Sequence, residues 1–90
     1  MSYPWEADPD AALTRRLGKS PAELGTTGGR DGCPDIWELD NGDIAVVGRD
    51  LTEAYQAGGL PQGLAVGAGE RLVVIPRITL LAAKADLPDA

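Results

Sequence analysis

The residues of this chain that could do chemistry are carboxylates and one thiol, because none of its 90 residues is a histidine. Histidine is the commonest general base and the commonest protein ligand of metal ions. The single cysteine, Cys33, therefore lacks its usual activating partner, and a small residue placed before a strand is the favoured interpretation. One cysteine without histidine forms neither a zinc site nor an internal disulfide. The sequence predicts no enzyme, no cofactor and no metal ion.

Three carboxylates, Glu38, Asp40 and Asp43, have the most suggestive spacing. Acid–base chemistry by a carboxylate pair requires one buried carboxyl and a cleft around both. These three flank Asn41-Gly42, which predicts an exposed turn rather than a cleft. Calcium binding by Asp40, Asn41 and Asp43 does not match the EF-hand spacing. We therefore expect an acidic surface at this turn and no reaction centre.

Two glycine-rich segments could in principle cradle a phosphate. Residues 25–32 lack the Gly-Lys-Ser/Thr ending of a P-loop. Residues 67–69 precede a predicted strand, whereas a dinucleotide-binding fingerprint follows one. Both segments are predicted to be turns, and 25–32 a flexible linker.

The turn is expected to join two strands in a hairpin over residues 35–48. A two-residue type I′ turn needs positive φ at both central positions, and Asn41-Gly42 meets that need. This turn pairs Leu39 with Ile44 and Trp37 with Val46. Because strand side chains alternate between faces, the pairing predicts one wholly apolar face and one that carries Glu38 and the Asp40/Asp43 pair. The apolar face consists of Trp37, Leu39, Ile44 and Val46.

Short helices are predicted from their start and stop signals. Asp8-Pro9 begins a helix over 9–17 that ends at Gly18. Ser20 and Glu23 form a capping box for a single turn that ends at Gly25. Asp50 caps a helix over 51–57, with a buried stripe of Leu51, Ala54 and Tyr55. Residues 77–85 follow Pro76 and have helical spacing, although the Ile-Thr start leaves a strand as an alternative.

Four consecutive aliphatic residues make 71–75 a strand in a central, buried position. The predicted class is a small α+β fold whose sheet is built on the 35–48 hairpin and the 71–75 strand. We expect residues 1–32 to be an N-terminal arm, a short helix and a glycine-rich linker, and residues 33–90 to form the small α+β domain. Helices over 9–17, 51–57 and 77–85 complete the fold.

The charge balance is acidic, with 14 Asp and Glu against 8 Lys and Arg and a net charge of −6. Such a field disfavours independent binding to nucleic acid or to acidic membranes, and it suits a basic protein partner or simply solubility. No signal peptide is expected at the N-terminus, and no apolar run approaches the length of a membrane span. We expect a cytoplasmic protein.

Residues 33–88, with CPDIWEL, NGDIAVVGRDLTE, VGAGERLVVIPR and AAKADLPDA, resemble a group of short, acidic actinobacterial proteins that accompany helix-turn-helix regulators. No activity is attached to that group, and the likeness implies a regulatory or accessory role. A second resemblance, to AbrB-type swapped-hairpin antitoxins, lies in a strand–helix–turn–strand order. Its counterparts here are 43–47, 49–55, 63–70 and 71–75.

We therefore expect a non-enzymatic, protein-binding accessory or regulatory subunit that acts through its acidic hairpin tip and an exposed strand edge. Its partner would be a basic protein or a helix-turn-helix regulator, and a homodimer is also expected to be possible. The alternative is a dimeric swapped-hairpin DNA-binding antitoxin, with Arg49, Arg71 and Arg77 on one face. A third class, a small enzyme or ligand carrier, requires a pocket lined by Asp, Glu and Arg. The candidate partner-binding residues are Trp37, Glu38, Asp40, Asp43, Arg49 and Tyr55.

Overall fold

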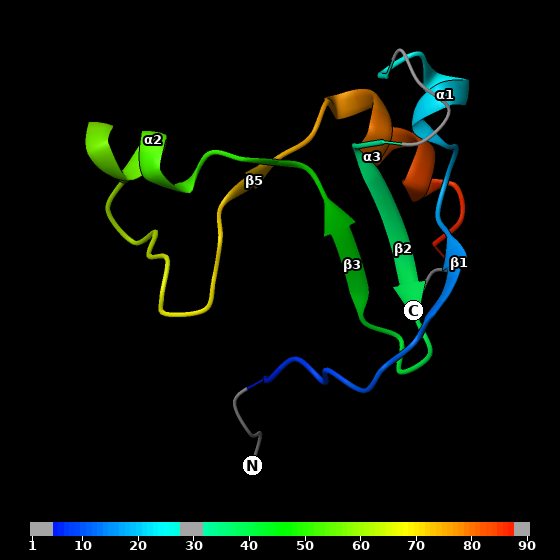
Figure 1. Cartoon of the computed structure of the whole chain (residues 1–90), viewed down its shortest axis with the longest axis horizontal. Helices are drawn as coiled ribbons and strands as arrows, with labels where there is room; N and C mark the ends of the chain where they lie inside the picture. The colour runs from blue at the N-terminus through cyan, green and yellow to red at the C-terminus, as the bar shows by residue number, and fades with distance from the viewer. Residues whose placement is uncertain (1–4, 28–31, 88–90) are drawn as a thin grey trace.

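The computed structural model describes residues 5–27 and 32–87, and within them it shows a small α+β fold with two antiparallel sheets and short helices (Figure 1). The predicted fold class is confirmed. Parts of the predicted arm, linker and C-terminal end lie outside the described residues. In chain order the elements are β1 (Leu13–Arg16), α1 (Pro21–Leu24), β2 (Asp35–Leu39), β3 (Ile44–Val47), β4 (Arg49–Asp50), α2 (Thr52–Gly58), β5 (Val73–Val74) and α3 (Arg77–Lys84).

The predicted hairpin is present as β2 and β3, but its turn has three residues instead of two. Leu39 N–H donates to Asp43 O at 2.8 Å, and Gly42 N–H donates to Leu39 O at 3.0 Å. Only Gly42 in this turn has positive φ, at 89°. A type I turn followed by a left-handed glycine satisfies these bonds, whereas a type I′ turn would also need positive φ at Asn41. The predicted two-residue turn is therefore wrong.

The longer turn shifts the register by one residue and changes which side chains share a face. Ile36 opposes Val46 and Glu38 opposes Ile44, so these four lie on one face, while Trp37 opposes Ala45 on the other. The predicted apolar face of Trp37, Leu39, Ile44 and Val46 does not exist, because it mixes residues from both faces.

The segment predicted as a helix over 9–17 is instead an extended strand that pairs with β2. Only a turn forms at Asp8, whose carboxylate accepts from Asp10 N–H at 2.8 Å. Leu13 pairs with Leu39 and Arg16 with Trp37, and a bulge lies between them. A nine-residue helix has little stability of its own, and the strand gains a ladder of bonds with β2. Tertiary pairing outweighs the helix signals here.

The other three helices are present near their predicted positions. Asp50 is not the N-cap of α2 as predicted, because Leu51 is that residue and Asp50 lies one residue before it. Ser20 and Glu23 form the capping box of α1, with Gly25 in the left-handed conformation at its end. The 77–85 segment is the helix α3, so the strand alternative is wrong. The predicted buried stripe of α2 is also wrong, because Tyr55 is exposed and Thr52 is the buried residue.

The predicted 71–75 strand does not join the hairpin sheet. Only Val73 and Val74 are extended, and they pair with β4 in a separate two-stranded sheet. Both valines are partly exposed, so the predicted buried central position is wrong. Gly48 marks the break, because a Cβ there would lie 2.7 Å from Val74 O. This close crossing carries the chain out of the hairpin sheet.

The described structure therefore has two parts (Figure 1). The sheet region contains β1–β3, α1 and α3, and the α2 lobe contains residues 49–74. The core lies in the sheet region, where Leu17, Ile36 and Ala83 are buried and Ile75 packs against them. No helix among the described residues is long and apolar enough to cross a membrane.

Candidate protein-binding surface

The free edge of β3 is the most accessible backbone surface of the sheet region. The strand order β1-β2-β3 leaves one side of β3 unpaired in the described chain. Leu39 and Asp43 form a hydrogen-bonded pair, and such pairs alternate along an antiparallel ladder. The backbone groups of Ile44 and Val46 therefore point away from β2. Ile44, Val46 and Val47 are exposed, and this edge carries no charge or proline.

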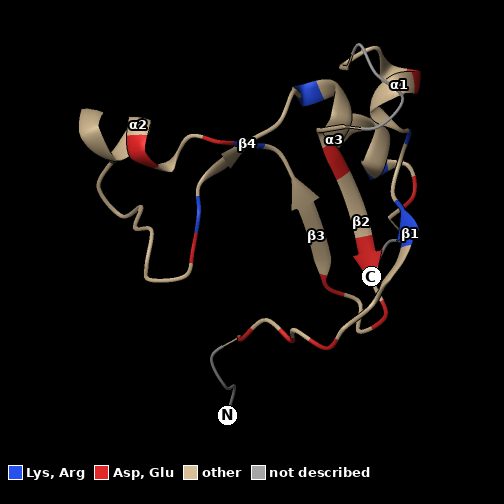
Figure 2. Cartoon of the chain, viewed as in Figure 1, with Lys and Arg blue, Asp and Glu red and all other residues tan. Residues whose placement is uncertain are grey.

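The acidic hairpin tip is present (Figure 2), but its carboxylates accept hydrogen bonds from elsewhere in the chain. Asp43 accepts from Trp5 Nε1 at 3.2 Å, and its N–H donates to Asn41 Oδ1 at 2.9 Å. Asp40 Oδ1 accepts from Ala12 N–H at 3.2 Å. These bonds hold the preceding N-terminal segment against the tip. The tip is therefore an acidic rim beside the β3 edge rather than a set of free carboxylates.

Trp37 and Glu38 point to opposite faces of the sheet, and each contacts an arginine of β1. Glu38 forms an ion pair with Arg15 Nε at 3.1 Å. The Arg16 guanidinium lies 5.0 Å from the centre of the Trp37 ring, a cation–π contact. The two residues therefore do not form one contact surface.

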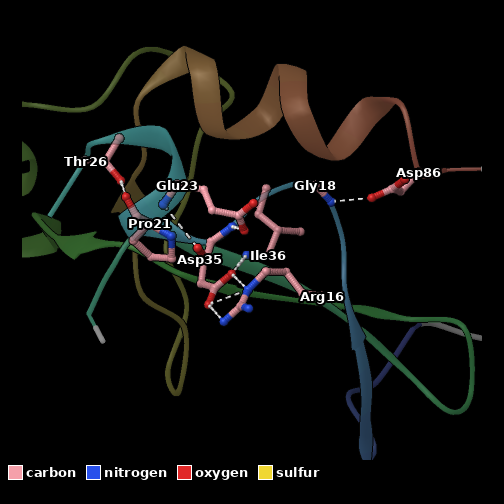
Figure 3. Close-up of polar contacts among 9 residues, drawn as sticks. Arg16, Gly18, Pro21, Glu23, Thr26, Asp35, Ile36 and Asp86 are labelled. Carbon is pink, nitrogen blue, oxygen red and sulfur yellow. Dashed lines mark hydrogen bonds and ion pairs between the residues drawn. The ribbon is translucent and has the colours of Figure 1, made fainter. Parts of the chain in front are cut away.

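Arg16 also forms a two-point contact with the buried Asp35 (Figure 3). Its Nε lies 2.9 Å from Asp35 Oδ1 and its Nη2 lies 2.9 Å from Oδ2. Burial alone would raise the pKa of Asp35, but hydrogen bonds, those from Arg16 first, together with the charge of Arg16 outweigh it and leave the pKa below its ordinary value. This contact ties β1 to the start of β2.

Arg49 and Tyr55 lie in the α2 lobe, away from the hairpin residues. Tyr55 lines an apolar cavity of about 290 Å³ with Leu60, Leu64, Leu72 and Val74 among its walls. Arg49 is exposed on β4. The six predicted site residues are thus divided between the two parts of the molecule.

The base of the α2 lobe is organised by Asp50. Its carboxylate accepts from Thr52 N–H at 3.0 Å, from the Thr52 hydroxyl at 2.7 Å and from Arg71 Nε at 2.9 Å. These hydrogen bonds, those from Thr52 first, lower the pKa of Asp50 to about 2. Thr52 Oγ1 in turn accepts from Leu72 N–H at 2.7 Å. Hydrogen bonds and an ion pair, rather than apolar packing, hold the two ends of the lobe together.

A cavity of about 340 Å³ is lined by Asp50, Glu53 and Arg71, the residue types that a small enzyme or ligand carrier would need. Arg71 and Asp50 bind each other at 2.8 Å, so both charges are already committed. No group of three His, Cys, Asp or Glu side chains in the described ranges is placed to hold a metal ion.

The sequence interpretation missed the residues that hold these groups in place, namely Trp5, Arg15 and Arg16. A helix over 9–17 placed both arginines at a helix end. Read as a strand, the alternation Leu13-Thr14-Arg15-Arg16 would have put the arginines on opposite faces. That alternation is the sequence signal that could have identified the strand.

No known family model, curated protein or solved structure matches this chain.

Proposed function

We propose that this chain is a non-enzymatic accessory or regulatory subunit that binds another protein by adding a partner strand to the free edge of β3. One observation carries the proposal: an uncharged, apolar strand lies at the edge of the sheet, with the backbone groups of Ile44 and Val46 directed outward. Strand addition at such an edge supplies main-chain hydrogen bonds, and the alternate side chains supply selectivity. Natural monomers usually protect their edges with charge, proline or a bulge.

Charge adds a preference for the kind of partner. The acidic tip borders one end of the β3 edge, and the net charge of the chain is −6. A basic partner would be attracted by this field, and the attraction would weaken as salt screens it. The resemblance to proteins that accompany helix-turn-helix regulators supports a basic, DNA-binding partner. The chain would then act on DNA through that partner.

Val46→Pro is the direct test, because it removes an outward N–H from the free edge while proline is tolerated at such positions. Val46→Thr is the matched control, since it keeps the N–H and the branched shape. Each tagged chain is used to capture partners from the source organism at low salt. We expect Val46→Pro to recover at least tenfold less of the partner than wild type, and Val46→Thr to recover similar amounts.

Circular dichroism and thermal unfolding confirm that both variants are folded. A wild-type chain recovered with no other protein bound would contradict the proposal. Full recovery of the partner by a folded Val46→Pro chain would also contradict it.

The DNA-binding alternative has the weaker support. The strand–helix–turn–strand order of that resemblance occurs as β3, α2 and β5, but Arg71 is bound to Asp50. The other two arginines of the predicted DNA-binding face lie on different elements, Arg49 on β4 and Arg77 on α3. A gel shift with the gene's own upstream DNA at low salt should show no retardation, although low salt favours even weak phosphate contacts. Retardation would restore the alternative. Stabilisation by a metabolite pool would similarly favour a ligand carrier.

A further inference from the structure

Helix α3 is packed with its small residues inward and its large apolar residues outward. Thr79 and Ala83 are buried against the sheet region. Ile78, Leu80 and Leu81 are 49%, 56% and 56% exposed. The helical repeat places Arg77 and Lys84 on the same outward side, between Leu80 and Leu81, so this side combines large apolar residues with two cations. The large outward residues Ile78, Leu80 and Leu81 are called the leucine face below.

Close packing at Gly18 explains the inward face. A Cβ on Gly18 would lie 2.6 Å from Ala83 N, so the helix backbone approaches the β1–α1 turn directly. Gly18 N–H also donates to Asp86 at 2.6 Å (Figure 3). Only small side chains fit in this contact. The orientation of α3 is therefore fixed, and its leucine face cannot turn inward.

The α2 lobe has an apolar groove without an occupant. Its cavity of about 290 Å³ is walled mainly by Tyr55, Leu60, Leu64, Leu72 and Val74. Tyr55 and Leu64 are about half exposed, at 48% and 47%. A cavity that shares Leu64 and Leu72 with this groove is also lined by Glu70 and by Arg71, and Arg71 is bound to Asp50. The groove thus has an apolar floor with the carboxylate of Glu70 beside it.

We propose that two copies of this chain form a closed dimer in which α3 of each copy docks into the α2-lobe groove of the other. The leucine face supplies apolar contacts, and the cations Arg77 and Lys84 lie on the same side of the helix. These charges complement Glu70 beside the groove. Within one chain the α2 lobe extends away from α3 (Figure 1). The two surfaces therefore match in chemistry but do not meet in the monomer.

The exposed area is sufficient for such an interface. A compact 9.4 kDa monomer exposes about 5000 Å², whereas this chain exposes 6991 Å². If the eleven residues outside the described ranges are counted as exposed as in an unfolded chain, the remaining residues still expose about 800 Å² more than a compact protein of their mass. Each partner of a standard interface contributes about 800 Å². The surplus is therefore of the same order as the contribution of one copy.

Symmetry closes the assembly at two copies. Each chain offers one helix and one groove, so a two-fold axis produces two equivalent contacts and leaves neither surface free. This dimer does not use the β3 edge, and the proposed binding of another protein is independent of it. Val46→Pro is accordingly expected to leave the dimer intact.

Light scattering after size-exclusion chromatography tests the stoichiometry. We expect a dimer for wild type and, for Leu81→Lys, a dissociation constant raised at least tenfold. Leu64→Lys should weaken the dimer similarly from the groove side, while the control Ala22→Lys on the exposed surface of α1 should not. Unchanged circular dichroism shows that each variant is folded. A monomeric wild type, or an open-ended polymer, would overturn the proposal.

Disulfide trapping tests which surfaces meet. In a Cys33→Ser background, chains with Leu81→Cys are mixed with chains with Leu64→Cys and oxidised. A disulfide-linked heterodimer is expected, and the control pair of Ala22→Cys with Leu64→Cys should give none. Failure to link Leu81→Cys with Leu64→Cys would overturn the geometry. So would a monomeric internal disulfide in a chain carrying both cysteines, since α3 would then occupy its own groove.

Discussion

The sheet region and the α2 lobe are held together by different forces. The sheet region buries Leu17, Ile36 and Ala83 between a three-stranded sheet and α3. The described lobe, residues 49–74, buries only the side chain of Thr52 and is joined at its base by hydrogen bonds around Asp50. A two-stranded ribbon is at best marginally stable alone. We infer that the sheet region folds by its own packing and that the lobe needs another surface to cover it.

The largest expected contrast comes from the same substitution in each part. Leu17→Ala removes a side chain that is 1% exposed, and it should lower the free energy of unfolding by about 3 kcal/mol. Leu64→Ala removes one that is 47% exposed, and it should change that free energy by less than about 0.5 kcal/mol. Urea denaturation in a Leu81→Lys background, which we expect to be monomeric, measures both. Equal losses would end the distinction between the two parts.

A smaller contrast separates backbone crowding from backbone conformation. Gly18 and Gly25 both have positive φ, at 81° and 72°. A Cβ at position 25 would lie in open space, so Gly25→Ala should lower the free energy of unfolding only by the cost of placing alanine in the left-handed conformation, about 1 kcal/mol. Gly18→Ala also meets the backbone of Ala83, so its loss of stability should exceed that of Gly25→Ala. Thermal unfolding compares the two variants, and equal losses would remove the close contact with α3 from the account.

The smallest expected effect is a pH-dependent loosening of the α2 lobe. The folded pKa of Asp50 is lowered from 3.8 to about 2. A lowered folded pKa stabilises the fold above the unfolded value, and this contribution is lost as the pH falls from about 4 towards about 2. NMR titration of the Asp50 carboxyl measures the value directly. Thr52→Val removes the hydroxyl donor and should raise this pKa, while Ser20→Ala, in α1, should leave it unchanged.

Local signals predicted much of this fold. The capping box of Ser20 and Glu23, the helix after Asp50 and the helix after Pro76 all depend on neighbours in the sequence, and all are present. The hairpin also followed from its turn residues. Its register did not, because Asn-Gly suits both a two-residue turn and the three-residue turn that forms here.

Long-range contacts account for the errors in the fold. Residues 13–16 have good helix formers, but pairing with β2 and the ion pair of Arg16 with Asp35 favour a strand. Residues 73–74 are as apolar as a central strand, yet the crossing at Gly48 directs them to β4. Neither contact has a signature within a short window of sequence.

The candidate surface was predicted only in part. The exposed strand edge followed from the small size of the sheet. The engagement of Asp43 by Trp5 did not, because those residues are 38 positions apart. The outward leucine face of α3 was also not predictable, since helical spacing of apolar residues normally indicates the buried side. Only the packing at Gly18 reveals which side of the helix faces the sheet.

Hydrogen exchange as a function of protein concentration tests the central claim most directly, namely that the sheet region is complete and the α2 lobe is completed by a partner. The reporters are the Tyr55 N–H, which bonds to Leu51 O in α2, and the Leu17 N–H, which bonds to Ile36 O in the sheet. We expect protection of Tyr55 to rise with concentration as dimers form, while Leu17 stays protected throughout. Strong protection of Tyr55 that is independent of concentration would contradict the account.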